Sequence, residues 1–192
     1  FPFNGNSNDG SGNGNNGTAS TMGLNVVANR FGKTNSAYEF DGGYITIPSF
    51  GTSNTNFTIS AWVYHDSNLG TVLGDRTILA KAGSGREYVM KLQNQYANAH
   101  FYTNTYFHTT SDVTMPSDAW FNYILKVEGT TWKLYKDGVL IKTVSHTSSN
   151  PWGTNNVVIG ALTGTGTESF NGKIDDIAIY SRALSQSEIT QL

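Results

Sequence analysis

The sequence predicts an all-β protein, a two-sheet antiparallel jelly-roll sandwich with a short C-terminal helix, on two observations. Many short segments alternate apolar and polar residues, the period-two pattern of half-buried strands. The clearest is Phe57–Tyr64, where every second residue from Phe57 to Val63 is apolar. No helical pattern of about 10–15 residues separates these segments, which excludes parallel βα repeats and favours two packed antiparallel sheets.

The other predicted strands are rich in β-branched and aromatic residues and are separated by short turns. They are Ala37–Phe40, Tyr44–Ile47, Thr77–Ala80, Glu87–Leu92, Asn98–Thr103, Tyr106–Thr110, Phe121–Val127, Thr131–Lys136, Val139–Val144, Asn156–Gly160 and Gly172–Tyr180. Asp137-Gly138 stands between two of them and predicts a type I′ hairpin, because both turn positions need φ > 0. Ser185 and Glu188 have the capping-box spacing, which predicts one or two helical turns at the end of the chain.

Composition narrows the class of protein. A length of 192 residues predicts a single domain spanning residues 1–192. The net charge of −2 provides no basic footprint for nucleic acid, and no apolar stretch is long enough for membrane insertion. Cysteine is absent, which excludes disulfides and thiol catalysis. The richness in Gly, Asn, Thr and Ser predicts a secreted or cell-surface, bacterial protein, and the opening at Phe1 predicts a mature or excised piece.

Residues 8–18 form a run rich in glycine and asparagine that contains one carboxylate, Asp9. Such a backbone turns sharply and aims carbonyl oxygens at one point, while Asp9 and the asparagine amides add side-chain oxygens. Calcium takes about six to eight oxygen ligands of this kind. Two interpretations remain open from the run alone: half of a calcium site, or a flexible linker.

A set of segments, taken in chain order, carries a family resemblance. They are Phe1–Asn6 with residues 9–17, Arg30–Gly32, Ser36–Gly42, Tyr44–Pro48, Phe57–Val63, Thr131–Gly138 and Gly172–Leu184. Together they resemble bacterial laminin-G-like jelly-roll domains of the concanavalin A-like lectin/glucanase superfamily. The resemblance implies a structural calcium ion between the two ends of the chain. The implied ligands are Asp9, Asn13, a backbone carbonyl near Gly43, and Asp175.

Asp175 bears on the same prediction from the residues alone. Period-two counting places Asp175 on the face of Ile177 and Ile179, and Asp176 on the other face. A carboxylate on an apolar face needs a cation or hydrogen-bond donors. Either calcium or capping of backbone N–H groups satisfies that need.

Catalysis is not expected. Retaining glycosidases need two carboxyl groups about 5–5.5 Å apart, but Asp175 and Asp176 are adjacent and point to opposite faces. Glu39 and Asp41 are two apart, yet Asp41 falls in the turn block of the family resemblance. The histidines show no metal-ligand spacing.

A glycan-binding surface is predicted in the middle of the chain, where aromatic rings to stack on sugars lie near polar groups to bind hydroxyls. The candidate residues are Arg86, Tyr88, His100, Tyr102 and Trp152. An alternative is that these aromatic residues cover the core. Trp62, Trp120 and Trp132 are predicted to lie in the core.

The sequence therefore predicts a non-catalytic carbohydrate-binding or adhesive module of a larger secreted or cell-surface protein. Its expected partners are a glycan or polysaccharide and adjoining domains, and its expected cofactor is calcium. One alternative is a structural or protein-interaction domain that packs on a neighbouring catalytic domain without binding sugar. A weaker alternative is a glycan-cleaving enzyme.

Overall fold

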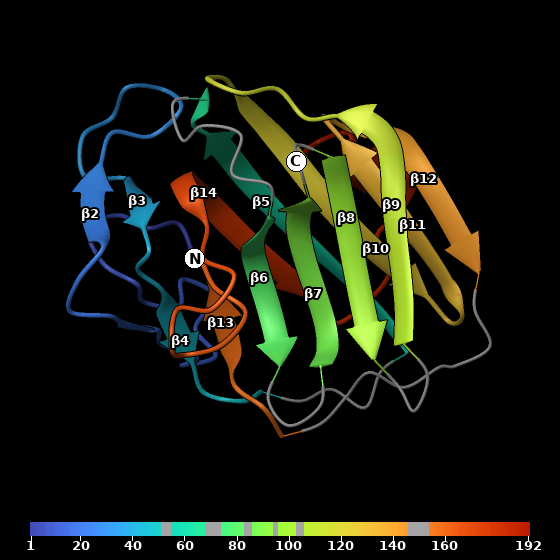
Figure 1. Cartoon of the computed structure of the whole chain (residues 1–192), viewed down its shortest axis with the longest axis horizontal. Coiled ribbons are helices and arrows are strands. Elements are labelled where there is room, and N and C mark those ends of the chain that lie inside the picture. Colours follow the sequence, from blue (N-terminus) through green and yellow to red (C-terminus); the bar gives the residue numbers. More distant parts are fainter. Residues whose placement is uncertain (51–54, 68–73, 83–85, 94–95, 103–105, 146–153) are drawn as a thin grey trace.

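The computed structural model describes residues 1–50, 55–67, 74–82, 86–93, 96–102, 106–145 and 154–192. For residues 86, 96–102 and 106–110 it describes the backbone alone. Within these ranges the chain forms two seven-stranded antiparallel sheets that pack face to face (Figure 1). The predicted jelly-roll sandwich is confirmed.

Each sheet joins strands from both ends of the chain. The first sheet has the order β1 (Thr18–Ala19), β4 (Ile45–Ile47), β13 (Val157–Ile159), β6 (Asp75–Ala82), β7 (Arg86–Gln93), β8 (Tyr96–Tyr102) and β9 (Tyr106–Thr114). The second has the order β12 (Val139–Ser145), β11 (Thr131–Lys136), β10 (Trp120–Glu128), β5 (Asn56–His65), β14 (Asn171–Tyr180), β3 (Ala37–Asp41) and β2 (Leu24–Val27). The short strands β1 and β2 were not predicted, because their residues are too few or too exposed to show an alternating pattern.

The core fills the space between the sheets with the apolar half of each alternating strand. Phe57 of β5 lies with its ring centroid 5.3 Å from Tyr88 of β7 and 6.1 Å from Trp132 of β11. All three side chains are buried. These rings join the two sheets through tilted and edge-to-face contacts, which aromatic pairs prefer over flat stacking.

The predicted hairpin and helix are both present. Asp137 and Gly138 have φ of 50° and 76°, as the turn between β11 and β12 requires. Helix α1 (Gln186–Ile189) begins with a capping box, in which the Ser185 side chain accepts a hydrogen bond from the backbone N–H of Glu188. Ile189 packs with Ile124, Tyr135 and Leu184 and covers part of the outer face of the second sheet.

Strand β14 contains a bulge that changes which side chains face the core. Asp175 is paired with Trp62 of β5, but the next paired residue of β14 is Ala178, opposite Ser60. Asp176 takes a positive φ of 45° within the bulge. Because one extra residue breaks the alternation, Asp175 shares the outer face with Trp62. The prediction that Asp175 lies on the same face as the core residue Ile177 is therefore wrong.

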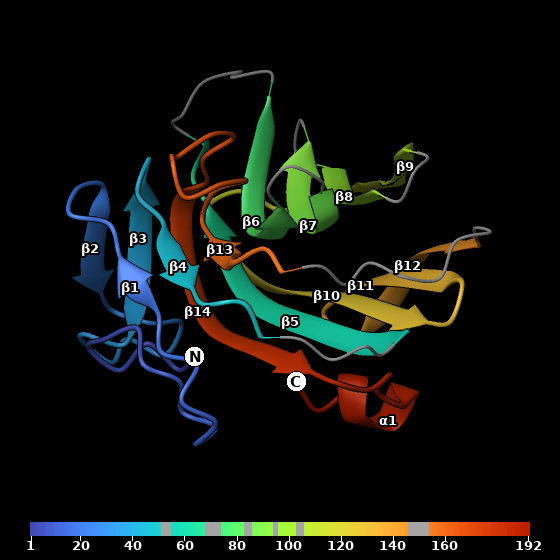
Figure 2. The same ribbon diagram turned by 90° about the horizontal axis from the view of Figure 1, so that it is seen from below.

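Beyond the bulge, the first residue of the chain lies beside β14. The backbone N of Phe1 donates to the Ile177 carbonyl at 2.6 Å, and the Ile177 N–H donates to the Phe1 carbonyl at 3.1 Å. Figure 2 shows the N-terminal segment and α1 on the same outer side of the second sheet. Residues from both ends of the chain therefore meet along β14.

Candidate functional site: a groove along β14

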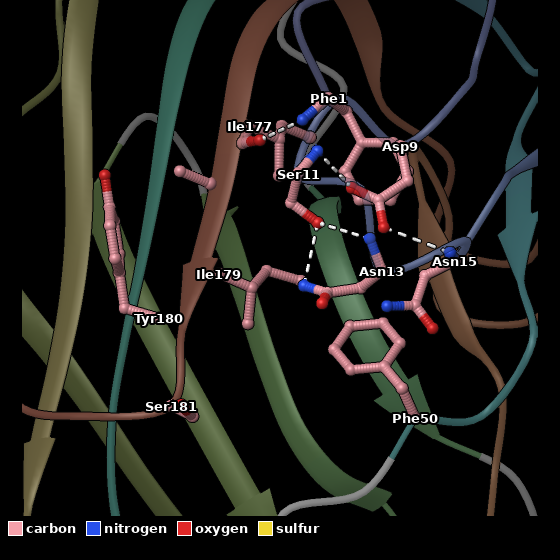
Figure 3. Close-up of a pocket in the computed structure, with 11 residues that line it drawn as sticks. Phe1, Asp9, Ser11, Asn13, Asn15, Phe50, Ile177, Ile179, Tyr180 and Ser181 are labelled. Atoms are coloured by element: carbon pink, nitrogen blue, oxygen red, sulfur yellow. Dashed lines mark hydrogen bonds between the residues drawn. The ribbon is translucent and has the colours of Figure 1, made fainter.

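A pocket of about 530 Å³ lies against the end of β14. This volume is within the range of about 300–1,000 Å³ that is typical of ligand sites. Figure 3 shows the residues around it, which come from the run at residues 8–18 (the glycine-rich loop), from Phe1 and Phe50 and from the end of β14. Its lining consists of Phe1, Asp9, Ser11, Asn13, Asn15, Phe50, Ile177, Ala178, Ile179, Tyr180 and Ser181.

The glycine-rich loop is held in shape by its own side chains. The Asp9 carboxylate accepts hydrogen bonds from the backbone N–H groups of Ser11 at 2.8 Å and Asn15 at 3.0 Å. Ser11 Oγ in turn accepts from Asn13 Nδ2 at 2.9 Å (Figure 3). The hydrogen bonds from Ser11, followed by that from Asn15, lower the pKa of Asp9 because they stabilise its charged form. The loop thus presents an ionised carboxylate and asparagine amides to the pocket.

A second pocket of about 410 Å³ continues along the same strand. Its lining shares Phe1, Ile177, Ala178 and Tyr180 with the first pocket. The side chains that it adds include Arg30, Ser60, Trp62 and Asp176. We call the two pockets together the β14 groove. It lies between the glycine-rich loop and the C-terminal residues Gln191 and Leu192.

Arg30 joins the groove to the bulge of β14. Its Nη1 donates to Asp175 Oδ2 at 2.9 Å and to Asp176 Oδ2 at 2.7 Å. Its guanidinium carbon lies 4.5 Å from the centre of the Trp62 ring, within the distance of a cation–π contact. The backbone N–H of Asp176 donates to the remaining oxygen, Oδ1, of Asp175 at 2.8 Å. The carboxylate of Asp175 is therefore bonded at both oxygens within the protein.

Burial makes Asp175 an unusual carboxyl group. The side chain is only 1% exposed. Desolvation, followed by the nearby charge of Asp176, raises the pKa of Asp175 to about 6, although Arg30 and the Asp176 N–H act in the opposite direction. The salt bridge to Arg30 therefore only partly offsets the cost of burying this charge.

The four predicted calcium ligands lie in three different surroundings. Asp9 and Asn13 line the groove, whereas Asp175 is bonded to Arg30. Gly43 lies in the turn between β3 and β4, where its N–H donates to the Gly23 carbonyl at 3.1 Å. Across the part of the chain that the structure describes, no group of three or more His, Cys, Asp or Glu is placed to hold a metal. Calcium binding by Asp9, Asn13, Gly43 and Asp175 therefore stays a prediction, in which the ion would compete with Arg30 for Asp175.

Tyr88 is the one predicted glycan-binding residue whose side chain the structure describes. Tyr88 is fully buried against Phe57, so it offers no ring to a ligand at the surface, and burial raises its pKa. The backbone pairs His100 with His108 and Tyr102 with Tyr106 across β8 and β9. The side chains of Arg86, His100 and Tyr102, and the whole of Trp152, lie outside the described residues.

Sequence reasoning missed the aromatic residues of the groove: Phe1, Phe50, Trp62 and Tyr180. Trp132 is in the core as predicted, but Trp62 and Trp120 are only half-buried. The sequence did indicate that Trp62 faces away from the core. It alternates with the apolar residues of its segment and shares a face with Ser60 and Tyr64. For Phe1 and Phe50 the sequence contains no such signal, since neither belongs to an alternating segment.

The two antiparallel sheets form a lectin-like β-sandwich with the groove along β14. A family model described as Concanavalin A-like lectin/glucanases superfamily (Laminin_G_3) matches residues 39–190. The chain therefore belongs to this family. No curated protein sequence matches the chain.

Solved structures share the fold at low sequence identity. Domain 4 of AbnA, an extracellular GH43 arabinanase of Geobacillus stearothermophilus solved with arabinotriose, is 18% identical with a TM-score of 0.80, and the match covers 98% of this chain and 93% of that one. The binding domain of Paraclostridial Mosquitocidal Protein 1 is 19% identical with a TM-score of 0.75, over 96% and 48% of the two chains. The botulinum neurotoxin serotype D binding domain is 16% identical with a TM-score of 0.70, over 93% and 46%. The chain thus spans about half the length of these toxin domains.

None of the helices in the described structure has the length and apolar character needed to cross a membrane.

Proposed function

We propose that the protein is a non-catalytic glycan-binding module of a larger secreted or cell-surface protein, and that it binds its glycan in the β14 groove. The observation that carries this proposal is the chemistry of the groove lining. The half-buried rings of Phe1, Phe50 and Tyr180 line the groove together with the polar groups of Asp9 and Asn13.

This combination suits a sugar because a sugar ring has both apolar C–H faces and polar hydroxyl groups. Aromatic side chains provide large, rigid contact area for the apolar faces. A few placed amides and carboxylates then fix the orientation of the hydroxyl groups. Half-burial of the rings supports the proposal, since each ring is anchored while part of its surface remains accessible.

The comparison with domain 4 of AbnA supports a glycan as the ligand. That domain was solved in complex with arabinotriose, and the match covers nearly all of both chains. At 18% identity the likeness extends to the fold alone. The choice of the groove therefore rests on its own lining.

The carboxylates of the groove support a non-catalytic role. Asp176 is bonded to Arg30, and Asp9 is bonded to two backbone N–H groups. The loop hydrogen bonds favour the ionised form of Asp9, whereas a glycosidase needs one protonated carboxyl group as its general acid. We expect no release of reducing sugar from any glycan that the protein binds.

The test is a binding titration with arabinotriose and a panel of other oligosaccharides, followed by Phe50→Ala and Tyr180→Ala. We expect each substitution to weaken binding about tenfold, which corresponds to ~1.4 kcal/mol. Tyr64→Ala is the matched control, because Tyr64 is a half-buried aromatic residue of the same sheet that makes a tilted ring contact with Trp120 outside the groove. Tyr102→Ala tests the predicted surface on the first sheet. Loss of binding in Tyr102→Ala but not in the groove variants would move the site to that surface.

A second candidate function, docking against an adjoining domain, is favoured by two exposed apolar side chains. Met22 is 81% exposed and Phe31 is 77% exposed. Exposed apolar residues mark interaction surfaces when they form one patch, and the experiment tests each of these two residues for such a role. Replacement of Met22 by serine in the full-length protein would weaken contact with the neighbouring domain and leave glycan affinity unchanged. Phe31 is replaced separately, because its ring lies 4.4 Å from the Arg30 guanidinium of the groove.

A further inference from the structure

We propose that the β14 groove selects neutral glycans and rejects those that carry carboxylates or sulfates. This inference rests on the proposed function and names the ligand class of the same site. It follows from the balance of charged side chains around the groove and from the contacts that each of them already makes.

Carboxylates outnumber cationic side chains in the groove. Asp9 stands on the glycine-rich loop, and Asp176 stands at the bulge of β14. Arg30 is the one basic side chain among the residues that line the two described pockets. Among the side chains of the lining, negative charge thus exceeds positive charge.

The charge of Arg30 is not available to an anionic ligand. Its Nη1 is shared between Asp175 and Asp176, and the guanidinium lies over the Trp62 ring. A ligand carboxylate that approached Arg30 would have to compete with two carboxylates already in place. Arginine normally recruits anions through paired N–H groups. In Arg30, Nη1 bonds the two carboxylates and Nε is buried, so such a pair is not open to a ligand.

Basic residues near the groove are also paired. Arg182, which follows the last residues of β14, forms a two-fold contact with Glu188 at 2.9 and 2.6 Å. Lys33, in the segment after Arg30, donates to Asn4 at 3.3 Å. Neither of them lines the groove.

The repulsion acts across the pH range in which a secreted protein works. The loop N–H groups that bond Asp9 keep its pKa below the ordinary value, so the carboxylate remains charged in mildly acidic solution. Like charges in a partly enclosed site cost affinity, and specificity is often built from such repulsion. The neutral amides of Asn13 and Asn15 remain to bind hydroxyl groups.

The experiment compares arabinotriose and cellotriose, as neutral probes, with trigalacturonate at low ionic strength. We expect at least one neutral probe to bind about tenfold or more tightly than trigalacturonate at about 0.01 M salt, where the Debye length is about 30 Å. The double variant Asp9→Asn/Asp176→Asn removes two charges and should narrow that ratio about threefold or more. Asn tolerates the positive φ at position 176, and melting temperatures verify that the variants are folded.

The matched control is Asp41→Asn, which removes one carboxylate from an exposed position outside the groove. It should leave the ratio unchanged. If the wild type binds neutral and anionic probes equally and Phe50→Ala removes both, the glycan function stands and charge selection is overturned. If the wild type binds no probe at any salt concentration, the proposed function itself fails. If the ratio is large but the double variant leaves it unchanged, charge selection by these residues is overturned.

Discussion

Each sheet buries a charged side chain on its outer side within a cluster of ion pairs. The two clusters differ in how far the partners of the buried charge are exposed to solvent. On the first sheet, Lys91 of β7 is fully buried and forms ion pairs with Asp75 and Glu168. These two carboxylate side chains remain 24% and 22% exposed. On the second sheet, the buried group is the carboxylate of Asp175, and Arg30 covers it.

The difference decides what each cluster does. The side chains of Asp75 and Glu168 are partly exposed, although Oδ1 of Asp75 is buried, so their charges do not depend entirely on Lys91. Asp175 has no such exposure, and its charge depends on Arg30 and on one backbone N–H. Where the partners of a buried charge are partly exposed, as for Lys91, the cluster covers part of the sheet surface. A buried charge covered by one arginine also fixes the position of that arginine, which here forms a wall of the groove.

The largest expected effect compares the same replacement in both clusters. Arg30→Met should lower the free energy of unfolding by about 3 kcal/mol at pH 8, because Asp175 is left charged and buried without its main partner. Lys91→Met should cost about 1 kcal/mol, because methionine fills most of the space and the remaining carboxylates are partly hydrated. Urea unfolding of both variants measures the difference. Equal losses would show that solvent access of the partners does not govern these clusters.

The next effect is a pH dependence that belongs to Asp175 alone. Its pKa in the folded protein is about 6, above the ordinary value of 3.8, so the folded state keeps the proton when the unfolded state has lost it. The contribution of Asp175 to the free energy of unfolding should therefore fall as the pH rises from about 4 to 6 and level off above, by on the order of 3 kcal/mol. Asp175→Asn should lack this fall. Parallel pH profiles of wild type and variant would refute the assignment.

The smallest expected effect concerns calcium and separates the two halves of the predicted metal site. Because Asp175 is bonded to Arg30, Asp175→Asn should not alter any change in melting temperature between EDTA and calcium. Asp9→Asn should abolish such a change if the loop binds the ion. Thermal melts of the two variants in both buffers are sufficient. Loss of a calcium response in Asp175→Asn would instead support the four-ligand site.

Much of the fold was predictable because it is encoded locally. The alternation of Phe57–Tyr64 appears as β5, Asp137-Gly138 forms its hairpin turn, and Ser185 with Glu188 starts α1. Each of these depends on the conformational preferences of a few neighbouring residues. The candidate site was predicted in part: Asp9 and Asn13 line the groove, but Tyr88 belongs to the core.

The remaining features depend on contacts between distant segments. The groove joins Phe1, residues 9–15, Phe50 and the end of β14, and no local pattern links them. No glycine in the sequence indicates the bulge next to Asp175. Asp176 itself takes the positive φ there, and Arg30 bonds the carboxylates of both residues. The sequence by itself determined the strands, turns and helix cap, because these follow from local backbone preference. Tertiary structure decided the face on which Asp175 lies, because one extra residue in β14 reverses the alternation. The packing of Phe1, Arg30 and Trp62 against the strand holds that extra residue in place.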